Sequence, residues 1–129
     1  MRPGLMVGQQ ALIEVRVTPE LLAQFDGKLI HPVYSTASMV YHMEWASRQI
    51  ILPYLEAEEE GMGAAVTAKH LAPCPLNSLI TFTATVSKLE NYTVITTVEA
   101  TNKERLVGLG EVKQVILSKK RIAELTAGT

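Results

Sequence analysis

The sequence has few of the features from which a function is usually read. Its 129 residues include a single cysteine, Cys74, which excludes an internal disulfide. Spacings typical of zinc sites, glycine-rich loops that bind phosphate, and internal repeats are all absent. Any functional site must therefore be assembled from side chains that lie far apart in the chain.

An excess of charge of one sign and long apolar runs are also missing. Twelve basic and thirteen acidic residues give a formal net charge of −1, so no broad positive field exists to hold nucleic acid or an anionic membrane. The longest mostly apolar stretch, from Met39 to Leu55, is interrupted by charged residues and is too short to cross a bilayer. The segment Met1–Gly4 lacks the apolar run of a secretory signal. We therefore expect a cytoplasmic protein without nucleic-acid or membrane partners.

The composition is that of a folded protein. Hydrophobic residues make up 47% of the chain and charged residues 19%, far from the polar composition of disordered chains. The length is common for one folding unit, so residues 1–129 are expected to form a single domain.

Most of the chain has the patterns of β-strands. Residues Leu79–Ser87 alternate between apolar and hydroxyl side chains, which predicts a half-buried strand. Gly108 and Gly110 weaken the last strand and favour a bulge or tight bend that lets a sheet curl around a helix. The other strands are predicted at Val7–Val17, Met62–Ala72, Tyr92–Ala100 and Leu106–Leu117.

Two helices are predicted between the first two strands. Thr18 and Pro19 are typical of a helix start and predict a short helix over Glu20–Gln24, followed by an extended loop at His31–Pro32. The main helix is predicted from Ser35 or Thr36 to a stop at Gly61. Its apolar residues cover more than one narrow stripe, so it should be enclosed on several sides. The expected fold class is α+β, with a curved antiparallel sheet of about five strands wrapped around one long central helix.

Glu44 is the first candidate for chemistry. It lies in the most apolar part of the predicted main helix, where an ionised carboxylate is costly unless it is paired. It can form an exposed ion pair with Arg48, four residues later. Alternatively, it is a carboxylate in a pocket that acts as a general base or nucleophile on an acyl group. The sequence leaves both interpretations open.

His70 and Thr36 complete the set of candidates, and each also has an ordinary structural interpretation. His70 lies in an apolar predicted strand and can be a buried histidine with both ring nitrogens hydrogen bonded. Thr36 stands where hydroxyl residues are preferred as helix N-caps. A hydroxyl, a carboxylate and an imidazole together suit acyl transfer, but spacing alone does not identify them as a site.

The segment from Ser35 to Pro73 resembles the fluoroacetyl-CoA thioesterase group of hotdog proteins. The family pattern has a threonine before the central helix, a Met-Glu-Trp-Ala-like stretch, a Pro-Tyr-Leu helix end, and a glycine followed seven residues later by a histidine. The matching positions are Thr36, Met43–Ala46, Pro53–Leu55, Gly63 and His70. The resemblance implies the hotdog fold and an acyl-CoA thioesterase.

The resemblance also implies roles for individual residues. Glu44 would attack the thioester carbonyl or activate water, His70 would shuttle a proton, and Thr36 would orient the reacting groups. Gly63 would line the substrate site with its backbone. The implied substrate is a small or medium acyl-CoA, with coenzyme A as part of the substrate and no separate cofactor or metal. The implied assembly is a homodimer, with further pairing to a tetramer left open.

Two positions depart from the family pattern. Members specialised for fluoroacetate carry phenylalanines in the loop before the threonine, whereas the loop Gly27–Tyr34 has none. An arginine expected in the final strand is replaced by Gln114. We therefore predict an acyl group other than fluoroacetyl.

The spacing of the candidates bears on how the site is assembled. If Thr36 and Glu44 belong to one continuous helix, eight residues separate them by about 12 Å along its axis. Either Thr36 lies in a turn that folds back, or the site is assembled from two subunits. We favour a site at the subunit boundary, by analogy with other hotdog proteins. Two rival functions are a hydratase or dehydratase acting on acyl thioesters and a non-catalytic acyl-binding module.

Overall fold

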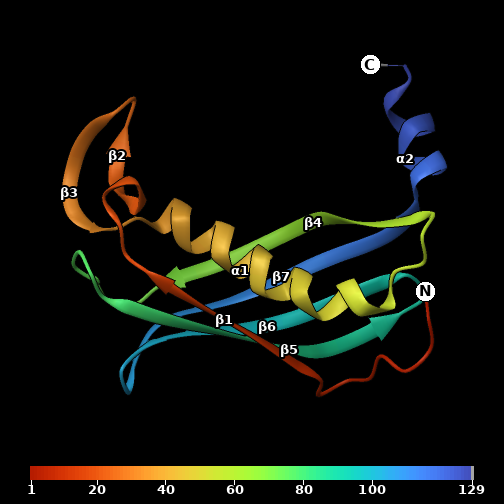
Figure 1. Ribbon diagram of the computed structural model, residues 1–129, viewed down its shortest axis with the longest axis horizontal. Coiled ribbons are helices and arrows are strands. Elements are labelled where there is room, and N and C mark those ends of the chain that lie inside the picture. The colour runs from red at the N-terminus through yellow and green to blue at the C-terminus, as the bar shows by residue number, and fades with distance from the viewer. Residues whose placement is uncertain (129) are drawn as a thin grey trace.

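The computed structural model describes residues 1–128 and consists of two sheets and two α-helices (Figure 1). The main sheet is antiparallel, with the strand order β1-β5-β6-β7-β4. A separate hairpin pairs β2 with β3. In chain order the elements are β1 (Gln10–Arg16), η1 (Pro19–Leu21), β2 (Leu22–Phe25), β3 (Lys28–Tyr34), α1 (Thr36–Ile51), η2 (Leu52–Tyr54), β4 (Glu59–His70), β5 (Leu79–Glu90), β6 (Thr93–Asn102), β7 (Arg105–Ser118) and α2 (Lys119–Thr126).

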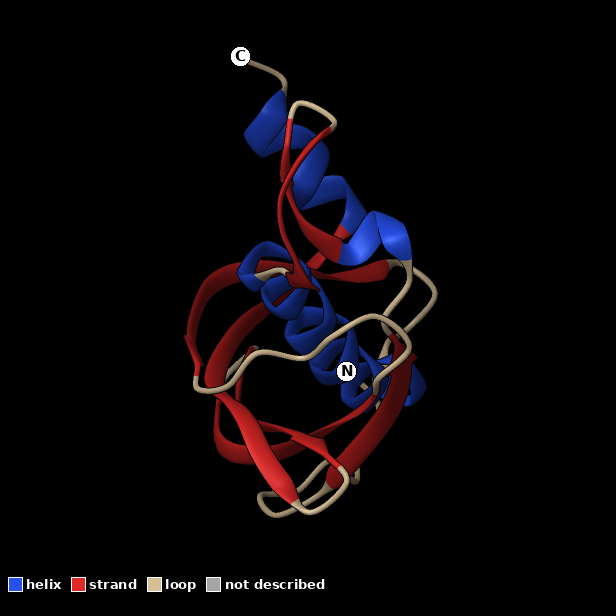
Figure 2. Cartoon of the chain, turned by 90° about the vertical axis from the view of Figure 1, so that its left-hand side faces the viewer, coloured by secondary structure: helices blue, strands red, loops and turns tan. Residues whose placement is uncertain are grey.

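The core lies between the concave face of the main sheet and helix α1. Figure 2 shows the strands curving around this helix. The alternation predicted for β5 is confirmed, because its apolar positions are buried and the hydroxyl positions between them are not. Helix α1 contributes one buried stripe to this core, comprising Met39, Met43, Ala46 and Ile50.

Two glycines in β7 let the helix approach the sheet closely. A Cβ atom on Gly108 would lie 2.6 Å from the sulfur of Met39, and one on Gly110 would collide with Met43. A bulge adjoins Gly108, because the pairing with β6 skips Val107. The predicted bulge near these glycines is therefore present, and the glycines also make room for the methionines of α1.

The predicted end of the main helix is wrong. The α-helix ends at Ile51, and Leu52–Tyr54 form a 3₁₀ turn that contains Pro53. Glu59 and Glu60, predicted to be helical, instead begin the edge strand β4. The ammonium group of Met1 lies 2.9 Å from the carboxylate of Glu59. The guanidinium group of Arg48 lies 2.9 Å from the carboxylate of Glu60. These long-range ion pairs are not visible in the local pattern.

The short helix predicted over Glu20–Gln24 is also wrong. Only Pro19–Leu21 are helical, as one 3₁₀ turn, and Leu22–Phe25 form strand β2 because they pair with β3. The extended His31–Pro32 segment belongs to β3. Figure 1 shows the β2–β3 hairpin standing at the end of the molecule where α1 begins. Within residues 1–128, no helix has the length and apolar character needed to cross a membrane.

Candidate active site

Thr36 and His70 are brought together where α1 begins and β4 ends. Ser35 caps the helix, since its hydroxyl accepts a hydrogen bond from the backbone N–H of Ser38 at 3.0 Å. Thr36 is therefore not needed as the cap. Its hydroxyl oxygen instead lies 2.9 Å from Nδ1 of His70, a contact that joins residues 34 positions apart in the chain.

The second ring nitrogen of His70 has no partner in the described part of the chain. Nε2 is buried and forms no hydrogen bond with any of residues 1–128. The interpretation of His70 as a structural histidine with both nitrogens satisfied within its own chain is therefore wrong. Burial lowers the pKa of His70, and the backbone of Ala72 offsets part of this effect. At neutral pH the ring is an uncharged imidazole that can accept a proton.

Glu44 lies further along α1 and does not make the ion pair considered for it. Arg48 pairs with Glu60, at 2.9 Å, and Glu44 has no ion pair within residues 1–128. Its side chain is exposed in the single chain and approaches Gly63 of β4. A Cβ atom added to Gly63 would lie 3.0 Å from Oε2 of Glu44, so the absence of a side chain at Gly63 makes this approach possible.

The backbone at Gly63 is irregular. Gly63 pairs with Gln114 of β7, and the next paired residue of β4 is Ala65, which leaves Ala64 outside the register. Such a bulge redirects backbone groups and is common beside functional sites. Because β4 is the last strand of the sheet, its outer edge has no neighbouring strand within residues 1–128.

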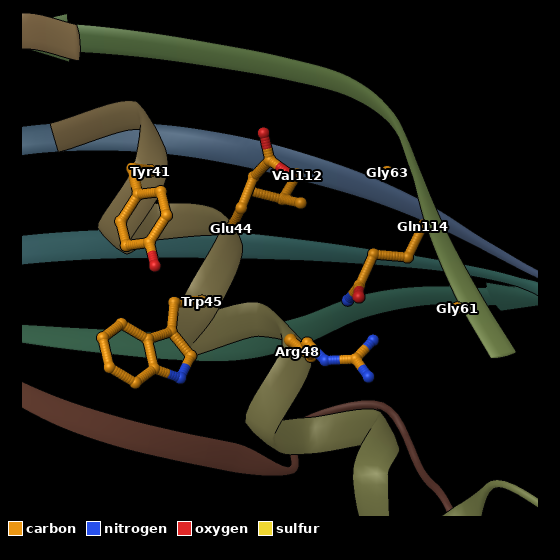
Figure 3. A pocket seen from close by; sticks show the side chains of 8 residues that line it. All are labelled: Tyr41, Glu44, Trp45, Arg48, Gly61, Gly63, Val112 and Gln114. Carbon is orange, nitrogen blue, oxygen red and sulfur yellow. The ribbon is translucent and has the colours of Figure 1, made fainter. Parts of the chain in front are cut away.

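A cavity of about 380 Å³ opens beside Glu44, between α1 and the sheet (Figure 3). Helix α1 provides aromatic and charged side chains, β4 provides two glycines, and β7 provides the side chains on its inner face. Neither Thr36 nor His70 lines it. The lining residues are Tyr41, Glu44, Trp45, Arg48, Gly61, Gly63, Val112 and Gln114.

The four predicted site residues thus form two pairs in one chain. Thr36 contacts His70, and Glu44 contacts Gly63, but the pairs do not meet. Thr36 and Glu44 are eight residues apart in one helix, which is about 12 Å. Gly63 and His70 are seven residues apart in one strand, which is about 20 Å. A single chain does not bring Glu44 to His70.

A buried tyrosine–histidine pair behind His70 was not predicted. Tyr34, at 1% exposure, is hydrogen bonded to Nδ1 of His42, and its ring edge packs against the ring of His70. Burial raises the pKa of Tyr34 and lowers that of His42, which keeps both side chains uncharged at neutral pH. The spacing of His42 from Met39 and Ala46 was the available signal, because these positions share one face of a helix.

A family model described as fluoroacetyl-CoA-specific thioesterase matches residues 17–120. The chain belongs to this thioesterase family. It is 31% identical over 123 residues to the fluoroacetyl-CoA thioesterase of Streptantibioticus cattleyicolor, an alignment that covers 91% of this chain and 88% of that protein. Membership of the family confirms the predicted thioester hydrolase and gives no support to a hydratase or a non-catalytic module.

Solved structures of this thioesterase superfamily agree with the fold. A thioesterase superfamily member from Thermus thermophilus is 43% identical, with a TM-score of 0.92 and coverage of 98% of this chain and 93% of that one. A mutant of a fluoroacetyl-CoA-specific thioesterase in complex with fluoroacetate and CoA is 25% identical, with a TM-score of 0.83 and coverage of 91% and 98%. The predicted hotdog fold is confirmed.

Proposed function

We propose that this thioesterase hydrolyses small or medium acyl-CoA molecules at a site shared by two copies of the chain. The observation that carries the proposal is the carboxylate of Glu44, which approaches Gly63 beside a cavity and has no ion pair with any of residues 1–128. The similar protein solved with fluoroacetate and CoA supports a coenzyme A thioester as substrate. Coenzyme A is then part of the substrate, and no other cofactor is required. A cytoplasmic location remains a prediction.

The edge strand β4 supplies the surface for pairing with a second copy. Residues 62–65 are exposed in the single chain, and an unpaired edge strand of this length readily pairs with another strand. Suppose that the β4 strands of two copies pair in antiparallel fashion, with the two-fold axis midway between Gly63 and His70. The partner subunit's His70 then lies opposite Gly63. The proposed homodimer therefore joins Glu44 of one chain to the Thr36–His70 pair of the other.

Each of these residues then has a separate role in the hydrolysis. Glu44 attacks the thioester carbonyl, or removes a proton from the water that attacks it. Backbone N–H groups at the Gly63 bulge stabilise the negative charge that develops on the carbonyl oxygen. In the general-base route, the partner's His70 accepts at Nε2 the proton taken from water and passes it to the thiolate as the C–S bond breaks, while Thr36 of the same subunit holds Nδ1. In the nucleophilic route, the broken C–S bond leaves an acyl–Glu44 anhydride, which a water molecule then hydrolyses; one proton of this water reaches the thiolate through His70, and the Glu44 carboxylate is restored. The products are a free acid and the CoA thiol.

Selectivity for the fluoroacetyl group is not expected. The hairpin before α1 has no phenylalanine from Gly27 to Tyr34, and Phe25, on β2, is 76% exposed. The phenylalanines that fluoroacetate-specialised members carry in this segment are therefore absent from Gly27–Tyr34, whose one aromatic side chain is Tyr34. The cavity of about 380 Å³ has room for longer acyl groups.

We expect kcat/KM for fluoroacetyl-CoA to lie within about tenfold of that for acetyl-CoA, and butyryl- or hexanoyl-CoA to be hydrolysed at least as well. Thiol release measured on these four substrates checks this expectation. A preference for fluoroacetyl-CoA of about a thousandfold would contradict the proposed selectivity. Absence of thiol release from every substrate would contradict the proposed function itself.

A further inference from the structure

The cavity lining includes a buried amide that no group in the described part of the chain satisfies. Gln114 is 5% exposed, and its Nε2 forms no hydrogen bond within residues 1–128. Buried polar groups are nearly always hydrogen bonded, so an amide without a partner calls for an explanation. The other buried nitrogen of this kind, Nε2 of His70, has a role in the proposed chemistry. Gln114 has none.

The position of Gln114 places its side chain in the lining of the cavity, across from Gly63. It pairs with Gly63 across the two strands, and residues paired in this way have Cα atoms about 5 Å apart. Figure 3 shows its side chain reaching from the sheet toward helix α1 on the side of Arg48. Because Glu44 also approaches Gly63, the Gln114 side chain and the proposed catalytic carboxylate line the same cavity.

The glycines opposite Gln114 let two side chains of α1 pack closely against β4. A side chain at Gly61 would collide with Ile51, and one at Gly63 would crowd the Glu44 carboxylate. On the β7 side, Val112 is the apolar neighbour of Gln114 on the inner face of the strand. The cavity lining therefore combines the Gln114 amide with apolar, aromatic and charged side chains.

The charges around the cavity do not favour an anionic acyl group. The only cation in its lining is Arg48, which is already paired with Glu60 at 2.9 Å. This hydrogen bond lowers the pKa of the Glu60 carboxyl, so Glu60 and Arg48 both carry their charges at neutral pH. The Glu44 carboxylate adds a negative charge without a partner. A neutral hydrogen-bond acceptor matches these surroundings better than a carboxylate.

We infer that Gln114 selects acyl groups that carry a neutral oxygen, as a hydroxyl or a keto group, near carbon 3. The amide N–H of Gln114 donates a hydrogen bond to that oxygen while Glu44 acts at the thioester carbonyl. This inference rests on the proposed acyl-CoA hydrolysis and specifies its substrate class. Unsubstituted acyl groups of the same length leave the amide unsatisfied, so they bind less well.

The test compares thiol release from butyryl-, 3-hydroxybutyryl-, acetoacetyl- and succinyl-CoA by the full-length protein. We expect kcat/KM for at least one of the two 3-oxygenated substrates to exceed that for butyryl-CoA by about tenfold or more. Succinyl-CoA, with its terminal carboxylate, should be the poorest. In Gln114→Met, which keeps the length of the side chain but removes the donor, the ratio of 3-oxygenated to butyryl activity should fall close to one.

A matched control is Lys113→Gln, because Lys113 is exposed on the opposite face of the same strand. It should keep the wild-type ratio. The inference is overturned if the wild-type protein hydrolyses butyryl-CoA as well as the 3-oxygenated substrates, or if Gln114→Met leaves the ratio unchanged. A preference for succinyl-CoA would overturn it as well. If none of the four thioesters is hydrolysed, the proposed function fails together with the inference.

Discussion

Replacing Glu44 by Gln is expected to lower kcat/KM for acyl-CoA hydrolysis by about 10²- to 10⁴-fold, the usual contribution of a positioned acid–base group. The amide keeps the shape of the side chain but is neither a base nor a nucleophile. Stability should change little, because Glu44 is exposed and has no ion pair within residues 1–128. Thiol release with the best substrate, and thermal unfolding of the same samples, measure the two effects separately.

Glu111→Gln is the matched control for this substitution. Glu111 is exposed on the outer face of β7, next to Val112 of the cavity floor but on the other side of the sheet. The Glu111→Gln variant carries the same chemical change, from carboxylate to amide, and should keep wild-type activity. If Glu44→Gln retains activity within about threefold of wild type, Glu44 does not take part in the chemistry.

Replacing His70 by Ala should also reduce kcat/KM by about 10²- to 10⁴-fold, and the wild-type pH profile should identify the same residue. Burial lowers the pKa of His70, and the neutral ring is the form that accepts a proton. Activity should therefore be constant near neutral pH and fall as the pH drops through a pKa below the usual histidine value of about 6.5. The residual activity of His70→Ala should lack this decrease.

His31→Ala is the control, because His31 is exposed on the β2–β3 hairpin. It should leave both the rate and the pH profile as in wild type. Two results would contradict the proposed role of His70. One is an acid decrease with a pKa above the usual histidine value, and the other is an unchanged decrease in His70→Ala.

The strands with clear alternation could be predicted from the sequence, and the segments that depend on distant partners could not. β5 was predicted within a few residues because its apolar and hydroxyl positions alternate without interruption. Glu59 and Glu60 look like the polar end of a helix, yet they lie in β4, where Met1 and Arg48 pair with them. Likewise, Leu22–Phe25 is a strand only because β3 lies beside it.

The candidate site was predicted as a set of residues but not as an arrangement. The resemblance named Thr36, Glu44, Gly63 and His70, while the contact between Thr36 and His70 depends on how α1 lies across β4. The helical spacing made a direct contact between Thr36 and Glu44 improbable if both belong to one continuous helix, and left open a turn that folds Thr36 back. The unsatisfied amide of Gln114 could not be foreseen, because it depends on the cavity that the fold creates around it.

The shared site can be tested most directly by mixing two inactive variants. In dimers of Glu44→Ala with His70→Ala, one of the two sites would contain both native residues, Glu44 from one chain and His70 from the other. Random exchange of subunits should therefore restore about a quarter of wild-type activity. As a control, Thr36→Ala mixed with His70→Ala should give no such gain, because both changes affect the same half of the site. If the mixture of Glu44→Ala and His70→Ala stays inactive after heterodimers are shown to form, the two residues do not act together across a subunit boundary.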